Sequence, residues 1–190
     1  MPRREFVFEP GRYYHIYNKS ENKERLFLEA ENYLFFLRKL KKYRPENLSI
    51  IAYCLMPTHF HFCIRIDGSV QVSKFISRLL DSYVKAFNKK YGRAGRLFKE
   101  RYKPKLVDSD AYLMHLCRYI HLNPVEANLV NKPDYWAFSN YSEFVGARNG
   151  KLFDKSFFKQ YWKAAADYER FVLDYRQKYP DGFDSVIFDE

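Results

Sequence analysis

Hydrophobic positions recur with two different periods along the first 124 residues, which predicts a mixture of helices and strands. A spacing of three to four residues, with the apolar side chains on one face, predicts three helices, over residues 29–43, 70–91 and 111–122. Short runs of β-branched and aromatic residues predict four strands, over residues 13–18, 48–55, 59–66 and 103–107. A further amphipathic helix is expected over residues 156–179, after a loop-like stretch that follows residue 124.

The order of these elements and the turns between them indicate the fold class. The turn at residues 56–58 is so short that the strands on either side are expected to form an antiparallel hairpin. Pro104 favours an edge position for the last strand, and Asn123-Pro124 is expected to end the third helix. The order β-α-β-β-α-β is typical of the α+β class: a split βαβ (ferredoxin-like or RRM-like) antiparallel sheet with helices on one face, here with a C-terminal helical extension.

Composition adds that the chain is globular and basic. Of its 190 residues 47% are hydrophobic, which excludes a disordered chain. The longest apolar run, residues 50–56, is far shorter than the roughly 18 residues of a membrane helix, so no membrane partner is expected. The net charge of +10 favours a polyanionic partner. The three cysteines form no C-x-x-C motif and are odd in number, so a reducing, cytoplasmic location is expected.

The excess charge is concentrated in residues 85–105, which hold nine basic side chains against the carboxylate of Glu100 alone. Aromatic residues are interleaved with these cations. Cations neutralise phosphates and rings stack on unpaired bases, so the segment predicts binding of single-stranded or hairpin nucleic acid. The candidate DNA-binding residues are Lys85, Lys89, Lys90, Arg93, Arg96, Lys99, Arg101 and Lys103. A solvated loop anchored to the core by its aromatic residues is the alternative interpretation.

His59 and His61 lie two positions apart on a predicted strand. Both imidazoles therefore leave the same face of the sheet, while Phe60 points to the other. Their attachment points are roughly 6.5 Å apart, close enough for both rings to reach one divalent cation at about 2.1 Å. Because such a pair also arises by chance, it is informative only if another element brings a third ligand and a nucleophile.

The third predicted helix carries residues that could complete such a site. Tyr119 and Asn123 are four positions apart and share a helical face, on which His115 lies one turn earlier. If the helix ends before Pro124, the Asn123 amide can reach out as an oxygen ligand. Each residue also has an ordinary interpretation: a half-buried ring, a C-terminal cap and a surface histidine.

Three segments taken together resemble the single-tyrosine HUH transposases, and most of all the branch associated with repetitive extragenic palindromes (REP), the RAYT proteins. These segments are residues 56–61 (MPTHFH), 95–103 (GRLFKERYK) and 118–125 (RYIHLNPV). The resemblance extends over roughly residues 10–145, with the motifs in the family's order. Phe98 stands where the family has a tryptophan in its Gly-x-Leu-Trp motif, which puts one stacking contact in doubt.

The resemblance implies a metal-dependent single-stranded DNA strand transferase, with a catalytic domain over residues 1–145 and a helical extension over 146–190. It implies that His59, His61 and Asn123 hold a catalytic Mg²⁺ or Mn²⁺ and that Tyr119 is the nucleophile. In the implied reaction the phenolate attacks a phosphorus at a hairpin repeat, forms a 5′-phosphotyrosine and releases a 3′-hydroxyl. The implied partner is single-stranded or hairpin DNA, and the protein is expected to act as a monomer or a homodimer.

Two alternatives stay open on the sequence alone. A split βαβ sheet with exposed aromatic residues also serves RNA-binding domains, so the chain could be a non-catalytic nucleic-acid-binding module with an RRM-like sheet. His59 and His61 would then only line the surface, and neither metal dependence nor a covalent adduct would be expected. A domesticated relative that binds repeat DNA without mobilising it is the second alternative.

Overall fold

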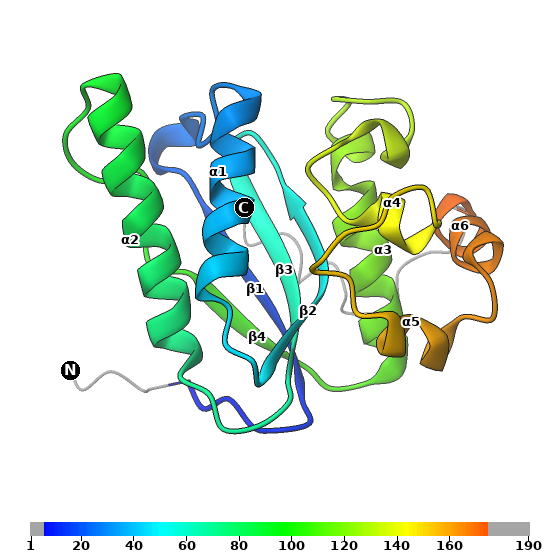
Figure 1. Cartoon of the computed structure of the whole chain (residues 1–190). Helices are drawn as coiled ribbons and strands as arrows, with labels where there is room; N and C mark the ends of the chain where they lie inside the picture. The colour runs from blue at the N-terminus through cyan, green and yellow to red at the C-terminus, as the bar shows by residue number, and fades with distance from the viewer. Residues whose placement is uncertain (1–5, 175–190) are drawn as a thin grey trace.

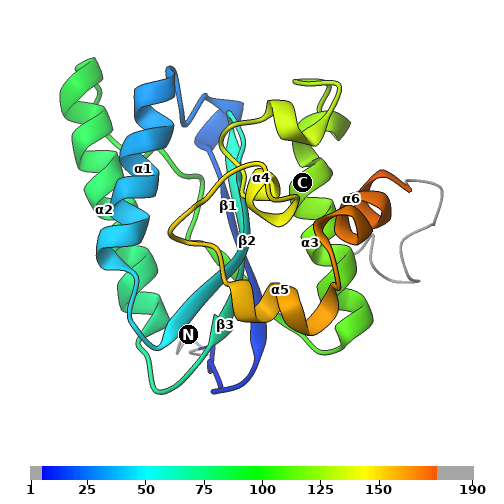
Figure 2. The same ribbon diagram turned by 45° about the vertical axis from the view of Figure 1, so that its right-hand side comes forward.

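The computed structural model describes residues 6–174 as a four-stranded antiparallel sheet with helices on both faces (Figure 1, Figure 2). The strands, in the spatial order β2-β3-β1-β4, are β1 (Tyr13–Lys19), β2 (Leu48–Leu55), β3 (His59–Ile66) and β4 (Lys103–Val107). The α-helices are α1 (Ala30–Tyr43), α2 (Val72–Tyr91), α3 (Asp110–Glu126), α4 (Tyr141–Phe144), α5 (Lys155–Tyr161) and α6 (Ala165–Leu173), and the 3-10 helices are η1 (Glu21–Lys23) and η2 (Pro133–Tyr135). None of the helices in this part of the chain is long and apolar enough to cross a membrane. The predicted α+β class and split βαβ order are confirmed.

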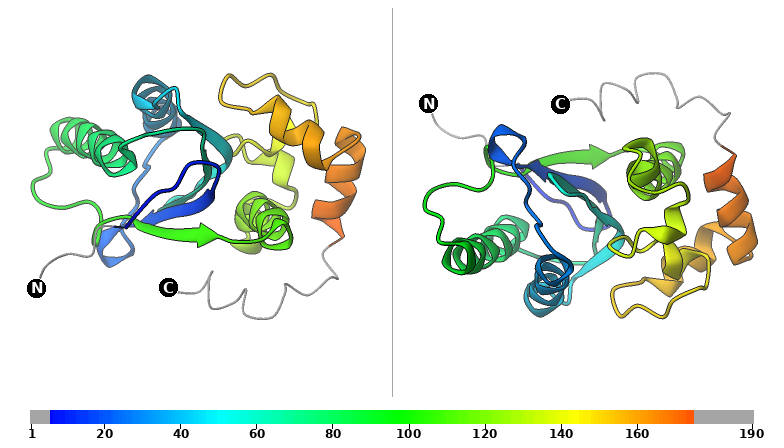
Figure 3. Two further views of the ribbon diagram at one scale, coloured as in Figure 1. Left: turned by 90° about the horizontal axis from the view of Figure 1, so that it is seen from below. Right: turned by 90° about the horizontal axis from the view of Figure 1, so that it is seen from above.

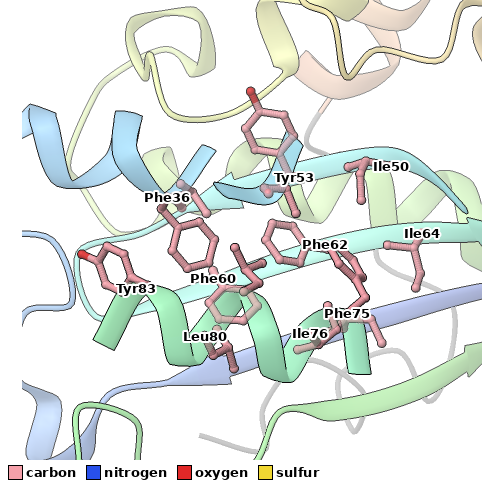
Figure 4. Packing of buried hydrophobic residues seen from close by; sticks show 14 of the residues in the cluster. Phe36, Ile50, Tyr53, Phe60, Phe62, Ile64, Phe75, Ile76, Leu80 and Tyr83 are labelled. Atoms are coloured by element: carbon pink, nitrogen blue, oxygen red, sulfur yellow. The ribbon is translucent and has the colours of Figure 1, made fainter. Parts of the chain in front are cut away.

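Helices α1 and α2 cover one face of the sheet and bury a cluster of aromatic rings against it (Figure 4). Phe60 and Phe62 of β3 point into this cluster, where Phe36 of α1 contacts both rings and also Tyr83 of α2. All four side chains are at most 1% exposed. Burying each large ring contributes roughly 2 kcal/mol, so the cluster holds β3 firmly and leaves its alternate residues pointing to the other face.

Helices α3 to α6 lie on the opposite side of the sheet, where α3 packs against β2 and β3 and α6 packs against α3 and α4 (Figure 3). Their apolar side chains form a second buried cluster, in which Phe144, Phe157 and Tyr168 lie with Cys54 and Cys63 of the sheet. The cysteines of the chain are buried thiols without disulfides. The sequence pattern predicts helices on one face only, because periodicity shows that a helix has an apolar side but not which sheet face that side covers. Residues on either side of the predicted domain boundary at 145 share this second cluster.

The third helix does not end before Pro124, and that prediction is wrong. Helix α3 continues to Glu126 with Pro124 inside its last turn. So close to the C-terminal end, the missing N–H of a proline removes only one helical hydrogen bond. Beyond it, the Ala127 N–H donates to the Asn123 carbonyl at 3.0 Å and the Leu129 N–H donates to the Pro124 carbonyl at 2.9 Å. Asn123 therefore leaves the helix from an ordered turn rather than from a frayed end.

The C-terminal part of the chain also differs from its prediction. The stretch after residue 124 contains η2 and α4 rather than only loop, and the helix expected over residues 156–179 is two helices, α5 and α6; residues 175–179 lie outside the described part. The backbone is extended at Trp162 and Ala164, and the Ala164 N–H donates to Asp167 Oδ2 at 3.0 Å where α6 begins. Phe157 of α5 and Tyr168 of α6 both belong to the second buried cluster.

Candidate active site

The His59 and His61 side chains leave β3 on the face that α3 covers. Because Phe60 and Phe62 occupy the cluster on the other face, alternation along the strand directs both imidazoles away from it. The two ring centroids are 5.1 Å apart, and the ring planes differ by 79°. His61 is 5% exposed, whereas His59, at the start of the strand, is half-buried. The site therefore opens to solvent at its His59 end.

Helix α3 brings the predicted nucleophile and the predicted third ligand to these imidazoles. The Tyr119 ring meets the His61 ring edge to face, with the centroids 5.3 Å apart. The His59 Nε2–H donates to Asn123 Oδ1 at 3.0 Å. Both α3 side chains are buried. The structure thus brings together the four predicted residues, although His59 and Asn123 are 64 positions apart in the chain.

The hydrogen bonds of His59 allow it to change tautomer. An amide oxygen only accepts, so His59 Nε2 carries the proton in its contact with Asn123, and Nδ1 accepts from the Thr58 hydroxyl at 3.1 Å. A hydroxyl can also accept, so Thr58 equally stabilises the tautomer in which Nδ1 donates. In that second tautomer His59 Nε2 presents a lone pair, which is what a metal ligand needs.

The chemistry of the donor set fits a divalent cation. His61 Nε2 is buried and has no hydrogen-bond partner within residues 6–174, an arrangement that a bound cation would satisfy. Burial, followed by the unfavourable electrostatics of a positive charge beside the His59 and His15 imidazoles, lowers the pKa of His61 well below its usual range, so the ring is neutral and able to bind metal. Two ligands at right angles, each about 2.1 Å from one cation, lie about 3.0 Å apart, which matches the separation of His59 Nε2 and Asn123 Oδ1.

The donors are two imidazoles and one amide oxygen rather than a set of acidic side chains. Within residues 6–174 no three His, Cys, Asp or Glu side chains gather to hold a metal ion. The Asn123 amide is neutral, so a divalent ion at this site would keep its full positive charge toward a phosphate. Mg²⁺ prefers oxygen ligands and Mn²⁺ accepts imidazole more readily, and this mixed set suits either ion.

His15 of β1 also belongs to this site, although it was not among the residues predicted to act there. Its Nε2 lies 2.9 Å from Nδ1 of His61. Burial and, to a smaller extent, the charge of Lys105 lower the pKa of His15 to about 3, so the ring is neutral. Alternation along β1 is the sequence signal that could have identified His15. Tyr14 and Ile16 enter the cluster that α1 and α2 bury against the sheet, so His15 must face the other way.

The remaining histidines of α3 contact α6 rather than the site. His115, predicted to share the face of Tyr119, accepts a hydrogen bond from Arg118 at 2.8 Å, and its ring lies against Phe171. His121 is fully buried, and burial lowers its pKa to about 4, so it is neutral. Neither ring is placed to serve as a metal ligand beside the His59–His61 pair.

A buried hydrogen-bond chain through His121 fixes the position of α3. The Tyr168 hydroxyl of α6 donates to His121 Nδ1, and His121 Nε2 donates to Asn140 Oδ1 at 2.9 Å. Asn140 in turn accepts from the Tyr53 N–H at 2.7 Å and donates to the Ile51 carbonyl at 2.8 Å, at the irregularity in β2. The C-terminal helices therefore tie the Tyr119 helix to the sheet that carries the imidazoles.

Replacing Asn140 with Ala is expected to destabilise the fold strongly. The change removes three buried hydrogen bonds and leaves two N–H donors and one carbonyl unpaired. Each such group costs about 1–3 kcal/mol, so we expect the free energy of unfolding to fall by roughly 4 kcal/mol. Urea denaturation measures this loss, with the exposed Asn131→Ala as a control that should change stability by less than about 0.5 kcal/mol. A loss below about 1 kcal/mol for Asn140→Ala would contradict the role of this chain of hydrogen bonds.

The predicted DNA-binding cations divide into two sets. One set lines a groove of about 1720 Å³ between α2 and the loop before β4: Lys85, Arg96, Lys99 and Arg101, joined by Lys74. Asp81 and Glu100 are the acidic residues of this groove, so its lining is basic overall. The other set includes three cations that pair with carboxylates: Lys90 with Glu29, Arg93 with Glu24, and Lys103 with Glu100. Lys89 is exposed near the end of α2. Within residues 6–174 the cations of the groove form no ion pair with a carboxylate, so the positive charge left for a partner is greatest along the groove.

Comparison with known proteins relates this chain to transposases. Residues 11–123 match the family described as "Transposase IS200 like". The structure of a REP-associated tyrosine transposase bound to a REP hairpin is similar to this chain, with a TM-score of 0.64, 16% sequence identity, and coverage of 82% of this chain and 98% of that one. A candidate transposase from Deinococcus radiodurans gives a TM-score of only 0.42, at 16% identity over 63% of this chain and 95% of its own. No curated protein matches the sequence.

Proposed function

Because this chain belongs to the IS200-like transposase family, we propose that it is a single-tyrosine HUH enzyme that cleaves and rejoins single-stranded DNA at hairpin repeats. One observation carries the proposal. The Tyr119 ring lies against His61, whose Nε2 is buried without a partner in the described residues, beside the contact between His59 and Asn123. A phenol next to a cation site is the arrangement that phosphoryl transfer to tyrosine requires.

Tyr119 supplies the nucleophile in this proposal. Its phenol oxygen forms a bond to a DNA phosphorus, and the bond from that phosphorus to the 3′ oxygen breaks. The phenol loses its proton to solvent and the departing 3′ oxygen gains one, which leaves a 5′-phosphotyrosine and a 3′-hydroxyl. The tyrosine ester retains the energy of the phosphodiester, so another 3′-hydroxyl can attack it and rejoin the strand without ATP.

His59, His61 and Asn123 would hold the divalent cation, Mg²⁺ or Mn²⁺. When bound, such an ion polarises a non-bridging phosphate oxygen and offsets the charge that develops on phosphate and leaving group. The chain itself contributes placement. Strand β3 presents two imidazoles on one face, and α3 holds Tyr119 against one of them, so the nucleophile is oriented before the substrate arrives.

We propose hairpin DNA with a single-stranded flank as the substrate. The basic groove beside α2 can hold phosphates without reading sequence, and the site opens at His59, where a flexible strand can enter. One chain supplies Tyr119, His59, His61 and Asn123, so the site is complete without a second copy and a monomer suffices. The proposal places this activity in the cytoplasm, where buried thiols such as Cys54 stay reduced.

Removing the cations of the groove is expected to weaken hairpin binding more than removing the paired cations. The triple variant Arg96→Ala, Lys99→Ala, Arg101→Ala loses up to three phosphate contacts. The negative slope of log affinity against log salt concentration should therefore become shallower, its magnitude decreasing by about 2–3. The double variant Lys90→Ala, Arg93→Ala removes cations that already pair with carboxylates and should leave that slope within about 1 of the wild type. Fluorescence anisotropy at several salt concentrations measures both slopes. Equal effects of the two variants would contradict the assignment of the groove.

The function is tested by trapping covalent adducts. The protein is incubated with a labelled library of single-stranded DNA hairpins and Mn²⁺, denatured, and separated from free DNA, and the attached DNA is sequenced. We expect an adduct that resists denaturation, enriched in hairpins with a single-stranded flank. Tight binding with no adduct and no dependence on metal would instead support the RRM-like binding module. Helices cover both faces of the sheet, however, and so restrict the open ring surface that such a module needs.

A further inference from the structure

His15 lies in the middle of β1, on the sheet face that carries His59 and His61. It is 1% exposed, and its Nε2 lies 2.9 Å from Nδ1 of His61. The planes of the two rings differ by 21° and the centroids are 5.1 Å apart. A hydrogen bond of this length made within the ring planes puts two imidazole centroids roughly 5 Å apart. The rings therefore lie side by side and share a hydrogen bond rather than stacking face to face.

One proton lies between these two nitrogens, and its location decides what His61 can bind. A neutral imidazole has one N–H and one lone pair. If the proton belongs to His61 Nδ1, then His61 Nε2 presents its lone pair. If it belongs to His15 Nε2, His61 must carry its own proton on Nε2, and a protonated nitrogen cannot bind a cation.

His61 Nε2 is the atom at which this choice matters. It is buried with no hydrogen-bond partner in the described part of the chain, and its ring contacts Tyr119. A lone pair at this atom is satisfied when a cation binds, whereas an N–H there would meet no acceptor among these residues. The arrangement compatible with a cation is therefore the one in which His61 donates to His15.

We propose that His15 is a positioning residue that accepts the Nδ1 proton of His61 and so directs the Nε2 lone pair of His61 toward the cation. The inference rests on the proposed function, because only a cation site gives this tautomer a use. Packing alone does not explain a histidine here. His15 Nδ1 is itself buried without a partner within residues 6–174, and an apolar side chain would avoid that cost.

The first test compares two replacements of His15 by their affinity for Mn²⁺. His15→Leu removes the acceptor. In His15→Gln the side-chain amide oxygen lies almost as far from the backbone as Nε2 of histidine does, so an acceptor is kept. Loss of such a supporting hydrogen bond weakens metal binding about 10–100-fold, so we expect that increase in the Mn²⁺ dissociation constant for His15→Leu and recovery of most of it in His15→Gln. The electron paramagnetic resonance signal of unbound Mn²⁺ measures the constant. His115→Leu, which removes an imidazole on the α6 side of α3, should not change it.

The outcomes separate this inference from the proposed function. Equal Mn²⁺ affinity in the wild type and His15→Leu overturns the role of His15 alone. A wild type that binds no Mn²⁺, or binding that survives His61→Ala, overturns the cation site and the inference with it.

The second test uses the unaltered protein without metal and so does not depend on a variant that folds. Nuclear magnetic resonance correlation of ring carbon-bound protons with ¹⁵N distinguishes protonated from unprotonated imidazole nitrogens. We expect His61 to be protonated at Nδ1 and unprotonated at Nε2, and His15 to be unprotonated at Nε2. A His61 ring protonated at Nε2 overturns the inference, while the adduct test of the proposed function stands apart from this result.

Discussion

Tyr119→Phe is expected to abolish the covalent protein–DNA adduct and to leave the affinity for hairpin DNA unchanged. The change removes one oxygen and keeps the ring that packs against His61, so the fold and the groove beside α2 are preserved. Without the nucleophile the covalent route is closed, and strand cleavage should fall by at least about 1000-fold. Denaturing gels with labelled DNA measure the adduct, and fluorescence anisotropy measures the affinity.

The matched control for this variant is Tyr112→Phe. Tyr112 lies two helical turns before Tyr119 on α3 and is half-buried, so the same atom is removed from the same helix. We expect Tyr112→Phe to form the adduct at a rate within a few-fold of the wild type. If the adduct persists in Tyr119→Phe and disappears in Tyr112→Phe, the assignment of Tyr119 as the nucleophile is wrong.

Removal of the metal is also expected to reduce strand cleavage strongly. Excess EDTA removes the cation from the site, and His59→Ala removes one of its ligands. In either case cleavage should fall by at least about 100-fold. The groove cations do not depend on the metal, so hairpin binding should change by less than about twofold. Restoring Mn²⁺ should rescue the chelated wild type but not His59→Ala.

His59 is the better of the two imidazoles for this experiment because it is half-buried, whereas His61 is buried and its loss would leave a cavity. His115→Ala is the control, since the His115 ring contacts Phe171 of α6 rather than the His59–His61 pair. Thermal unfolding should show that His59→Ala and His115→Ala remain folded at the assay temperature. Full cleavage in excess chelator would count against a metal-dependent mechanism.

The central part of the fold was accessible from the sequence because its strands are bounded by strong signals. The observed bounds of β2, β3 and β4 are those predicted, since apolar runs there are delimited by turn residues such as Pro57 and Gly68. Pro104 correctly indicated that β4 lies at an edge of the sheet. These signals are local, and tertiary contacts reinforce rather than override them.

Other features depend on contacts that no local pattern reveals. Pro124 signals a helix end, yet α3 continues to Glu126, about one turn beyond its predicted end at residue 122. The single helix expected from residue 156 onward breaks at Trp162–Ala164, where the backbone is extended and the Ala164 N–H donates to Asp167 Oδ2 at the start of α6. Periodicity identifies the buried side of each segment, but the cluster that the side joins is decided by the whole fold.

In the candidate site, too, some features follow from local sequence motifs and others depend on tertiary contacts. His59, His61, Tyr119 and Asn123 could be grouped because short motifs mark them, and the structure brings them together. His15 could not be assigned a contact with His61, because the pairing of β1 with β3 is a tertiary property. Likewise the carboxylates that pair with Lys90 and Arg93 lie more than 60 positions away, so the sequence overstates how much of the basic segment is available to DNA.

Peptide mapping of the trapped adduct identifies the residue that becomes joined to DNA. After incubation with a reactive hairpin and Mn²⁺, the complex is digested with nuclease and protease, and mass spectrometry locates the residue that carries nucleotide. We expect a single modified site, Tyr119, linked to the 5′-phosphate of the cleaved strand. A nucleotide attached to any other residue, or cleavage that proceeds with Tyr119 unmodified at every time point, would contradict this expectation.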